Sequence, residues 1–549
     1  MLTWAAAGVA VVFGTWMVWQ RRWISDDGFI NYRIIQQLLA GRGPTYNAAE
    51  RVEGGTSTLW LGLVWLGQAI TPGSDTGAVM VALGTALSAL ALALLAVGAF
   101  ALHPGRPLLL PVGLAVVVAI APMWDFGTSG LETSLSMAWI AACFAGLAVR
   151  VRRGPAARPA WQPWPLAVLI GLGPLVRPDF ALLSLGFGIA LLWQSGRRWR
   201  AWLAAAGIAL VVPVAYEIFR MGFFASLVPN TALAKSNGSW AQGLLYLRDF
   251  VGTYWLWIPI AIGVWLIGSR VARRPASGEP DARSLIVILP LTALAHTAFV
   301  VSVGGDFMHG RFLLPATFLF FAPIALVPAT GHRRILVALV AVGAVSSALL
   351  LRPQLWNGMI ADERSYYSTF VPDTPGASVP LENWSADVGF QLARKAAADQ
   401  AQSESYYVAV GQPDQPLPRN GTGVAFLATS LGIAGAASGI DVTVADTPAL
   451  VDPIGSRVVL PADAEFRVGH AYRPEVWVVA RLASGDRTPP LAGLADARTA
   501  LSCAPVVELM DAISQPLTPE RFFTNLMLAP KLTFLRIPVD PAEAVARLC

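Results

Sequence analysis

Long apolar stretches alternate with short polar ones through the first 351 residues, and the pattern stops there. Apolar runs near 20 residues long with few charges are typical of membrane-spanning helices. The runs that we interpret as spans cover residues 2–19, 76–102, 108–123, 135–149, 164–176, 180–194, 201–219, 252–268, 285–302, 312–329 and 335–351. The sequence therefore predicts a polytopic α-helical membrane protein with about 11 transmembrane helices.

A twelfth apolar run, 57–72, is shorter and is interrupted by two glycines. Its Trp60 and Trp65 suit a helix that lies in the membrane interface, where Trp side chains are enriched. If this run spans the membrane, the polar loop before it is cytoplasmic. If it lies along the surface, residues 20–75 form one external loop with interfacial helices. We favour the second arrangement, although it leaves two arginines outside.

Composition supports the membrane assignment and divides the chain in two. Of the 549 residues, 55% are hydrophobic and 13% are charged, whereas a soluble domain has about 25% charged residues. Residues 1–351 hold 24 Lys+Arg against 13 Asp+Glu, and residues 352–549 hold 15 against 21. The positive charge therefore belongs to loops beside membrane helices and does not indicate nucleic-acid binding. The second part is predicted to be a mildly acidic soluble domain.

Clusters of arginine determine the predicted sidedness, because cytoplasmic loops carry an excess of Lys and Arg. The clusters fall between alternate spans, so all can be cytoplasmic together: Arg150–Arg158, Arg197–Arg200, Arg270–Arg283 and Arg333–Arg334. This assignment places residues 352–549 on the external side of the membrane. The first apolar run has no basic segment before it and no cleavage site of small residues, so we interpret it as a retained helix.

Nearly all acidic residues of the first part fall on the external side in this topology. Asp26 and Asp27 follow the first span directly, inside the long loop 20–75. Ionisable groups at membrane depth are functional candidates. The sequence therefore predicts an active site at the external mouth of the bundle. The other acidic residues that we assign to it, as sugar or acceptor ligands, are Glu50, Glu53, Asp125, Glu132, Asp179 and Asp306.

Glycosyl transfer from a lipid phosphate is the chemistry that these residues suit. Cations must hold the departing phosphate, and the candidates are Arg177, Lys235, His309 and Arg311. Carboxylates must face the positive charge that develops on the sugar and the acceptor hydroxyl. Asp26 and Asp27 are the catalytic candidates. Two adjacent carboxylates can also share a divalent cation, so a metal requirement is left open.

Each feature also has a simpler interpretation. An Asp-Asp pair after a helix is usually a solvated turn, and the acids at 50 and 53 could be exposed loop charges. Arg177 and Asp179 could form only an ion pair within a loop, and His309 could be structural. A transporter of lipid-linked sugars also has many spans. It would place polar residues through the bilayer midplane, whereas charges here gather at one face.

Residues 352–549 are predicted to form a mixed α/β domain. Strands are expected at 406–410, 440–445 and 476–480, and helices at 382–400 and 424–438. Cys503 and Cys549 both lie in this part, where an external location permits oxidation. We predict that they form a disulfide, with two free thiols as the alternative. Cys143 lies in an apolar run and is predicted to be a packing residue.

Several strings taken together resemble one family: QRRWISDDGFI, LLAGRGPTYNAAERVEGGTST, DFGTSGLET, LVRPD, PVAYEIFRMGFFASLVPNTALAK, GGDFMHGRFLLPA and ADERSYY. In this order they resemble the AftB family of actinobacterial arabinofuranosyltransferases. The Asp-Asp pair after the first helix resembles the wider GT-C superfamily of glycosyltransferases. The resemblance covers nearly the whole chain and is patchier in the second part.

The resemblance implies a function and a set of partners. The donor would be the lipid decaprenylphosphoryl-arabinose, and the acceptor the non-reducing end of cell-wall arabinan in arabinogalactan and lipoarabinomannan. The product would be a terminal β-(1→2) linkage, formed with retention because donor and product would both be β. Asp26 and Asp27 would take the catalytic place of the GT-C pattern, and the second part would bind carbohydrate. A GT-C enzyme for another sugar, such as a mannosyltransferase, is the alternative within the superfamily.

Overall fold

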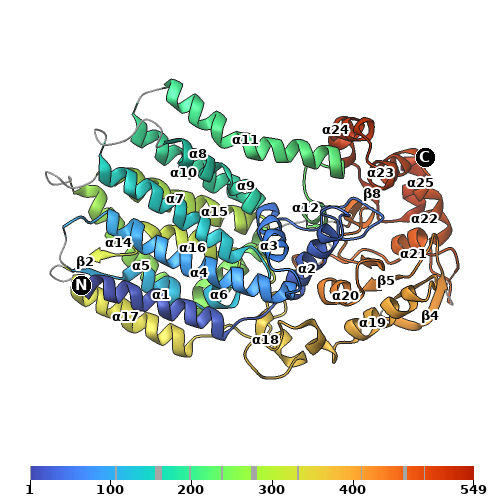
Figure 1. Ribbon diagram of the computed structural model, residues 1–549, viewed down its shortest axis with the longest axis horizontal. Helices are drawn as coiled ribbons and strands as arrows, with labels where there is room; N and C mark the ends of the chain where they lie inside the picture. The colour runs from blue at the N-terminus through green and yellow to red at the C-terminus, as the bar shows by residue number, and fades with distance from the viewer. Residues whose placement is uncertain are drawn as a thin grey trace.

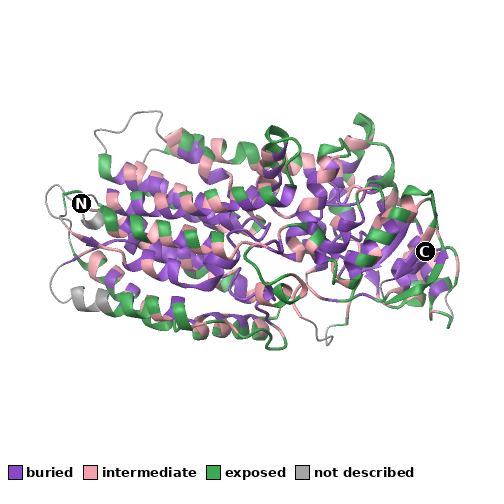
Figure 2. Cartoon of the chain, turned by 60° about the horizontal axis from the view of Figure 1, so that its bottom comes forward, coloured by how far each residue is buried: buried purple, intermediate pink, exposed green. Residues whose placement is uncertain are grey.

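The chain forms a helical bundle at one end and an α/β part at the other, as the computed structural model shows (Figure 1). The structure describes residues 2–105, 108–154, 163–196, 199–235, 239–273, 281–329, 333–409, 411–461, 467–486 and 489–549. One cluster of buried apolar side chains runs from Ala7 in the first helix to Val451 in the C-terminal part. Buried residues accordingly continue from one part into the other (Figure 2).

Apolar helices build the bundle. They are α1 (Leu2–Gln20), α4 (Thr76–Ala101), α7 (Thr133–Arg153), α8 (Pro163–Gly171), α9 (Gly173–Val176), α10 (Ala181–Ser195), α11 (Trp199–Phe224), α13 (Trp240–Thr253), α14 (Trp257–Ala272), α15 (Arg283–Ser302) and α17 (Arg333–Leu350), with the 3₁₀ turn η1 (Pro178–Phe180) before α10. Among the described residues, four helices are long and apolar enough to cross a membrane: α4, α7, α11 and α15. The pair α13 and α14, bent by 89°, would make a fifth span. Shorter apolar helices fill several of the other predicted spans, while the count of 11 stays a prediction.

Two predicted spans combine short helices with a strand. Residues 108–123 form β1 (Leu109–Leu110), α5 (Val112–Ala119) and the start of α6 (Ala121–Asp125). Residues 312–329 form α16 (Leu314–Phe321), the 3₁₀ turn η2 (Ala322–Ile324) and β2 (Val327–Pro328). The strands β1 and β2 pair with each other in antiparallel fashion. Prolines in both segments explain the breaks, because proline cannot donate the hydrogen bond that a helix interior needs.

The loop between α1 and α4 carries two helices, α2 (Asp26–Leu39) and α3 (Thr58–Ile70). The hydroxyl of Ser25 accepts a hydrogen bond from the N–H of Gly28 at 3.0 Å and so caps α2, which places both aspartates in its first turn. A Cβ at Gly28 would collide with the carbonyl oxygen of Ser129, so only glycine permits this packing. α3 has 13 residues, fewer than the about 20 that a span needs. Its length favours an interfacial helix.

A mixed four-stranded sheet in the order β4-β3-β5-β6 forms the centre of the C-terminal part. Parallel pairing joins β3 to β5 and β5 to β6, and β4 adds an antiparallel edge. The strands are β3 (Tyr406–Ala409), β4 (Gln412–Pro418), β5 (Ala425–Ala428) and β6 (Thr443–Asp446), with a separate parallel pair, β7 (Val458–Val459) and β8 (Ile537–Pro538).

The C-terminal part also contains helices. They are α18 (Glu363–Tyr367), α19 (Val388–Ala401), α20 (Leu431–Ala437), α21 (Val476–Leu482), α22 (Leu494–Leu501), α23 (Ala504–Ser514), α24 (Pro519–Thr533) and α25 (Pro541–Leu548). Three 3₁₀ turns complete the part: η3 (Ser368–Phe370), η4 (Leu381–Trp384) and η5 (Gly455–Arg457).

Two predictions for this part are wrong. Residues 476–480 form the start of helix α21 and not a strand. All five side chains are buried, and a fully buried strand has the same apolar pattern as a short buried helix. Residues 424–438 form β5 followed by α20, with a bend at Thr429 and Ser430, and not one helix. The other expected strands and the helix at 382–400 correspond to β3, β6 and α19, although Val410 lies outside the described residues.

The first turn of α2 packs directly on α20. A Cβ at Gly432 would collide with the carbonyl oxygen of Asp26, so the two helices approach as closely as glycine allows. Arg33 is fully buried at this junction. Its guanidinium donates hydrogen bonds to the carbonyl oxygens of Gly435, Gly439 and Val442. Loop 20–75 therefore helps to fix the C-terminal part on the bundle, together with α11, whose Gly222 carbonyl accepts a hydrogen bond from Asn525.

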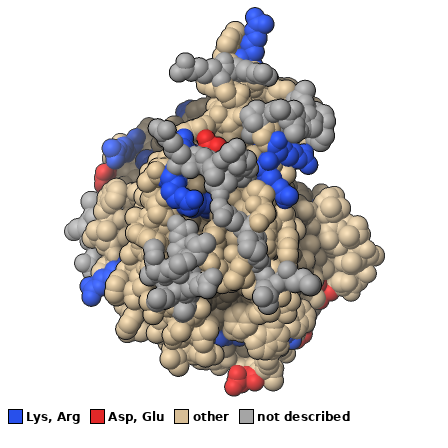
Figure 3. Space-filling view, turned by 90° about the vertical axis from the view of Figure 1, so that its left-hand side faces the viewer, with Lys and Arg blue, Asp and Glu red and all other residues tan. Residues whose placement is uncertain are grey.

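Basic side chains gather on the end of the bundle that faces away from the C-terminal part (Figure 3). The exposed arginines at the helix ends there include Arg152, Arg153, Arg200 and Arg273. This distribution agrees with the predicted cytoplasmic side. Four arginines on which that prediction also rests lie outside the described residues: Arg158, Arg197, Arg198 and Arg274.

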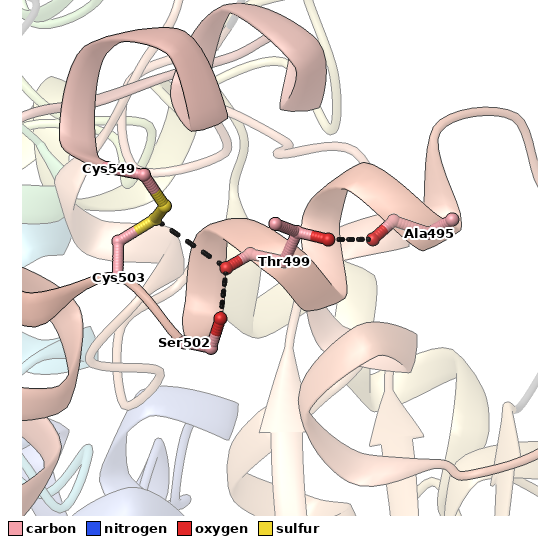
Figure 4. Close-up of a disulfide and its surroundings, with 5 residues drawn as sticks. All are labelled: Ala495, Thr499, Ser502, Cys503 and Cys549. Atoms are coloured by element: carbon pink, nitrogen blue, oxygen red, sulfur yellow. Dashed lines mark hydrogen bonds between the residues drawn. A yellow bond between two sulfur atoms is a disulfide. The ribbon is translucent and has the colours of Figure 1, made fainter.

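A disulfide joins Cys503, before α23, to Cys549, the last residue of the sequence. Their Cα atoms are 5.0 Å apart across a separation of 46 residues. Beside the disulfide, the carbonyl oxygen of Thr499 accepts a hydrogen bond from the hydroxyl of Ser502 at 2.7 Å (Figure 4). The disulfide thus ties the C-terminal helix α25 to α22 and α23. Cys143 is a free, buried thiol in α7.

Candidate functional site

A cavity of about 530 Å³ lies where the bundle meets the C-terminal part. Its walls come from the first turn of α2, the segment 54–57, the short helix α12 (Asn230–Ala234) and the end of α15. Six charged side chains from five separate segments of the chain line it: Asp27, Glu132, Arg177, Asp179, Lys235 and Arg311. All six are among the site residues predicted from the sequence.

The two adjacent aspartates point to different partners. Oδ1 of Asp26 accepts a hydrogen bond from the N–H of Ile433 in α20 at 2.8 Å. Burial raises the pKa of Asp26 to about 7, although that N–H works in the opposite direction. Asp27 lines the cavity, and within the described part of the chain its carboxylate has no hydrogen-bond or ion-pair partner. Asp27 is therefore the free carboxylate of the pair.

Arg177 is held in place by two carboxylates of the same cavity. Its guanidinium lies 2.8 Å from Oε1 of Glu132 and 3.0 Å from Oδ1 of Asp179. The other oxygen of Asp179 lies 2.9 Å from Nε2 of His296 in α15. Burial would raise the pKa of Asp179, but Arg177 and His296 lower it by more, so this carboxylate stays ionised. The face of the guanidinium also lies over the ring of Phe312, 4.2 Å from its centroid.

Arg311 and Lys235 provide the other two cations. Nε of Arg311 lies 2.7 Å from Oδ2 of Asp306, which is buried behind the cavity wall. Burial lowers the pKa of Arg311, but Asp306 and then Asp27 more than offset this, so the guanidinium is charged. The ammonium of Lys235 has no ion-pair partner among the residues that the structure describes. Three positive groups therefore reach one cavity, and Lys235 is the least constrained of them.

His309 does not line this cavity, although the sequence analysis assigns it to phosphate binding. Its Nδ1 lies 2.5 Å from Oδ2 of Asp249 in α13. Its Nε2 is buried without a hydrogen-bond partner in the described structure. It borders a void of about 10 Å³, together with Asp125 and Glu363. The structure therefore places His309 beside the site and not in it.

Four predicted sugar or acceptor ligands lie outside the cavity lining, and each of them pairs with an arginine. Glu50 lies 2.7 Å from Arg481, and Glu53 lies 2.7 Å from Arg220. Asp125 pairs with Arg21, and Asp306 with Arg311 as described above. Burying a carboxylate is costly unless it is paired, so these contacts account for the acids without a ligand. They join loop segments to each other and to the C-terminal part.

Glu363 is a residue of the site region that the sequence analysis did not select. It is buried at the start of α18, and its Oε2 has no hydrogen-bond partner in the described structure. Burial, and after it the charge of Asp27, raises the pKa of Glu363 well above its usual range. Its position beside α2 depends on how the chain returns after α17. In the sequence, Glu363 was indicated only by its place in the family-like string ADERSYY.

The described residues contain no group of three or more His, Cys, Asp or Glu side chains arranged to hold a metal ion. Asp26 and Asp27 could share a cation only if both carboxylates faced the same space. Asp26 instead binds α20, whereas Asp27 lines the cavity.

Comparison with known proteins shows to which family the chain belongs. Residues 385–546 match the AftB family C-terminal domain. The chain is 30% identical to a terminal β-(1→2)-arabinofuranosyltransferase of Mycobacterium tuberculosis, an alignment that covers 99% of this chain and 96% of that protein. This chain belongs to that arabinofuranosyltransferase family. It is also 36% identical to a protein of the same name from Corynebacterium glutamicum, over 67% of this chain and 58% of that protein. No solved structure matches the chain.

Family membership makes this chain a membrane glycosyltransferase and extends over both of its parts. The matched C-terminal domain contains the whole four-stranded sheet, α20 and Cys503. The long alignment with the mycobacterial arabinofuranosyltransferase includes the bundle and the loop that holds the two aspartates. Both walls of the cavity therefore belong to the shared architecture of the arabinofuranosyltransferases.

Proposed function

We propose that this chain transfers arabinofuranose from decaprenylphosphoryl-arabinose to the non-reducing ends of cell-wall arabinan and forms terminal β-(1→2) linkages. The observation that carries the proposal is the single cavity in which three cations face an unpaired aspartate. The names of the two relatives supply the sugar and the linkage. The lipid-phosphate donor is the chemistry that the three cations fit.

Arg177, Lys235 and Arg311 bind the donor phosphate in this proposal. A guanidinium suits phosphate because its N–H groups match two oxygens at once. Arg177 is oriented before any ligand arrives, since Glu132 and Asp179 fix it from two sides. Preoriented donors stabilise the charge that develops on the departing phosphate. His309 is not part of this set.

Asp27 faces the reacting sugar. During transfer the bond between the anomeric carbon and the phosphate oxygen breaks, and its electron pair leaves with the phosphate. The acceptor hydroxyl forms the new C–O bond and gives its proton to the carboxylate of Asp27. A carboxylate at this position stabilises the positive charge on the sugar ring. Asp26 is a positioning residue, because its contact with Ile433 fixes the turn that presents Asp27.

The C-terminal domain, 352–549, binds the arabinan acceptor on the periplasmic side, and residues 1–351 form the GT-C catalytic domain in the plasma membrane. Two observations support this division. Loop 20–75 makes buried polar contacts with the C-terminal part, as at Asn47, whose Nδ2 donates to the carbonyl oxygen of Val444 at 2.8 Å. Leu450 of that part also contributes to the cavity wall, so an acceptor bound there is next to the site.

The test is transfer by the purified protein in lipid nanodiscs. Radiolabelled decaprenylphosphoryl-arabinose and a synthetic arabinan oligosaccharide should give a product whose new residue is β-(1→2)-linked by linkage analysis. The matched control is Asp27→Asn protein, which should give no product above background. If transfer occurs only from a mannosyl or other polyprenyl-phosphate sugar, that sugar is the donor in place of arabinose. Movement of labelled lipid across the bilayer without transfer would indicate a transporter.

A further inference from the structure

A second cavity, of about 260 Å³, lies between α3 and α11 on the side of the bundle. Most of its wall is apolar, with Leu38, Leu61, Trp65, Phe219 and Phe224 as the large side chains. We call it the α3–α11 groove. No step of the proposed reaction uses it.

The groove begins next to the catalytic cavity. Gly55, in the segment before α3, lines both spaces. From there the groove follows α3 through Thr58, Gly62 and Trp65, away from the charged residues. A molecule whose charged end lies on Arg177 therefore has the groove within reach of its other end.

The few polar groups in the groove are already satisfied by each other. The hydroxyl of Tyr216 donates to Oε1 of Glu53 at 2.6 Å, and Arg220 pairs with the same carboxylate at 2.7 Å. A sugar would need unpaired hydrogen-bond partners, because burying free hydroxyl groups is costly. An apolar chain needs none. The lining therefore favours a hydrocarbon occupant.

The surroundings of the groove are also apolar. α11 is exposed along most of its length, with Val211, Val214 and Ile218 showing 63%, 50% and 47% of their surfaces. On α3, Leu66 and Ile70 are exposed as well. Surfaces of this kind face lipid chains in a membrane. A hydrocarbon chain can therefore pass from the bilayer into the groove without crossing a polar surface.

We propose that the α3–α11 groove holds the phosphate-proximal isoprene units of the donor lipid, so that the chain leaves the catalytic cavity past Gly55 and enters the bilayer beside α11. This inference rests on the proposed function, which requires a polyprenyl-phosphate donor. It adds the route of the hydrocarbon chain. The competing route passes Phe299 and Val303 at the end of α15, which also border the catalytic cavity.

Gly62 offers a direct test by blockage. It lines the groove, and a Cβ added there would meet no atom within 4 Å, so Gly62→Leu should fold and fill the space. The apparent KM for decaprenylphosphoryl-arabinose should rise about tenfold. The acceptor KM, and kcat at saturating donor, should stay at wild-type values. The matched control is Gly207→Leu on α11, another open glycine, which lies outside the groove and should behave as wild type.

Photo-crosslinking keeps the inference falsifiable if the variant does not fold. A non-transferable donor analogue with a diazirine on its first isoprene unit is irradiated with wild-type protein in nanodiscs, and labelled peptides are mapped. Labels on the α3 and α11 peptides support the groove. Labels on the α15 peptide overturn it, as does an unchanged donor KM in Gly62→Leu. Wild-type protein that transfers no arabinose from the lipid donor contradicts the proposed function itself, which the wild-type assay reports separately.

Discussion

Oδ1 of Asp26 accepts the N–H of Ile433 at 2.8 Å, and this contact gives the two adjacent aspartates different tasks. Asp26 is bound to α20 of the C-terminal part, so it cannot turn into the cavity without breaking this partly buried hydrogen bond. Asp27 follows it on the helix, lines the cavity and keeps a free carboxylate among the described residues. The contact with the C-terminal part thus gives two chemically identical neighbours different surroundings.

Asp27→Asn should therefore abolish transfer, whereas Asp26→Asn should weaken it less. We expect kcat to fall at least about 100-fold for Asp27→Asn, because a reacting-centre carboxylate contributes on that scale. Asp26→Asn keeps an oxygen that accepts from Ile433 and should retain a larger share of activity. Initial rates with labelled donor measure both. Asp441→Asn, an exposed acid on the C-terminal part, is the control. Equal losses in both aspartate variants would contradict the division.

Stability should depend on the protonation of Asp26. Burial raises the pKa of Asp26 to about 7, so the folded state binds this proton more tightly than the unfolded state. The contribution of Asp26 to stability is thus largest at low pH and falls as pH rises from about 4 to about 7. Asp26→Asn resembles the protonated acid at every pH. Its Tm should exceed that of wild type at pH 8 by roughly 2–4 °C and approach it at pH 5. A difference in Tm between variant and wild type that grows toward low pH would contradict this prediction.

The disulfide between Cys503 and Cys549 should stabilise the C-terminal part measurably. Closing a loop of this length contributes about 4 kcal/mol in the chain-entropy model. The double variant Cys503→Ala, Cys549→Ala should therefore unfold at lower temperature in scanning fluorimetry. Reductant should lower the Tm of wild type and leave that of the double variant unchanged. Recovery of both thiols as free, alkylatable groups in freshly purified wild type would refute the bond.

Loop 20–75 and the C-terminal part should be accessible from the same side of the membrane. The hydrogen bond between Asn47 and Val444 requires this. Ala48→Cys and Ser403→Cys occupy exposed positions of these two segments and should react with an impermeant thiol reagent in intact cells. Arg153→Cys, on the opposite end of the bundle, should react only after permeabilisation. Labelling of position 48 only from the cytoplasmic side would indicate that α3 spans the membrane and would contradict the interfacial interpretation.

Sequence reasoning selected the six charged residues of the cavity because charge type and loop position are properties of the sequence. It could not separate them from Glu50, Glu53 and Asp125, which are equally acidic and equally external. What separates them is where the arginine partner lies: Glu132 and Asp179 pair with Arg177 of the cavity itself, whereas the partner of Glu50 is Arg481, more than 400 residues away in the chain. Such a pairing follows from the packing of the C-terminal part on loop 20–75, and no local pattern encodes it.

The fold shows the same division between local and distant information. Apolar runs indicated where helices lie, but prolines broke two of the expected spans into short pieces. The apolar run at 476–480 has the composition of a strand and forms a helix, because its neighbours bury it on every side. The position of Glu363 beside Asp27 depends on the return of the chain after α17. Each of these outcomes is decided by tertiary contacts.

His296 should act on the donor through Asp179 and Arg177 without touching the substrate. A carboxylate can only accept a hydrogen bond, so Nε2 of His296, 2.9 Å from Oδ2 of Asp179, must be the donor. Asp179 in turn holds Nε of Arg177 at 3.0 Å. Without the histidine, Asp179 can rotate and Arg177 loses one of its two anchors.

His296→Ala should therefore raise the donor KM more than it lowers kcat. Loss of a hydrogen bond to a charged group costs about 1.5–3 kcal/mol, and a part of that cost should reach donor binding as roughly a tenfold rise in KM. His296→Gln keeps an N–H donor of similar reach and should restore much of the affinity. Thr297→Ala is the matched control, because the neighbouring hydroxyl bonds only to a carbonyl oxygen of its own helix, that of Ala293. A merely structural role would lower yield and kcat for Ala and Gln alike, with the donor KM unchanged. Donor titrations of the three variants in nanodiscs would show which of these patterns holds.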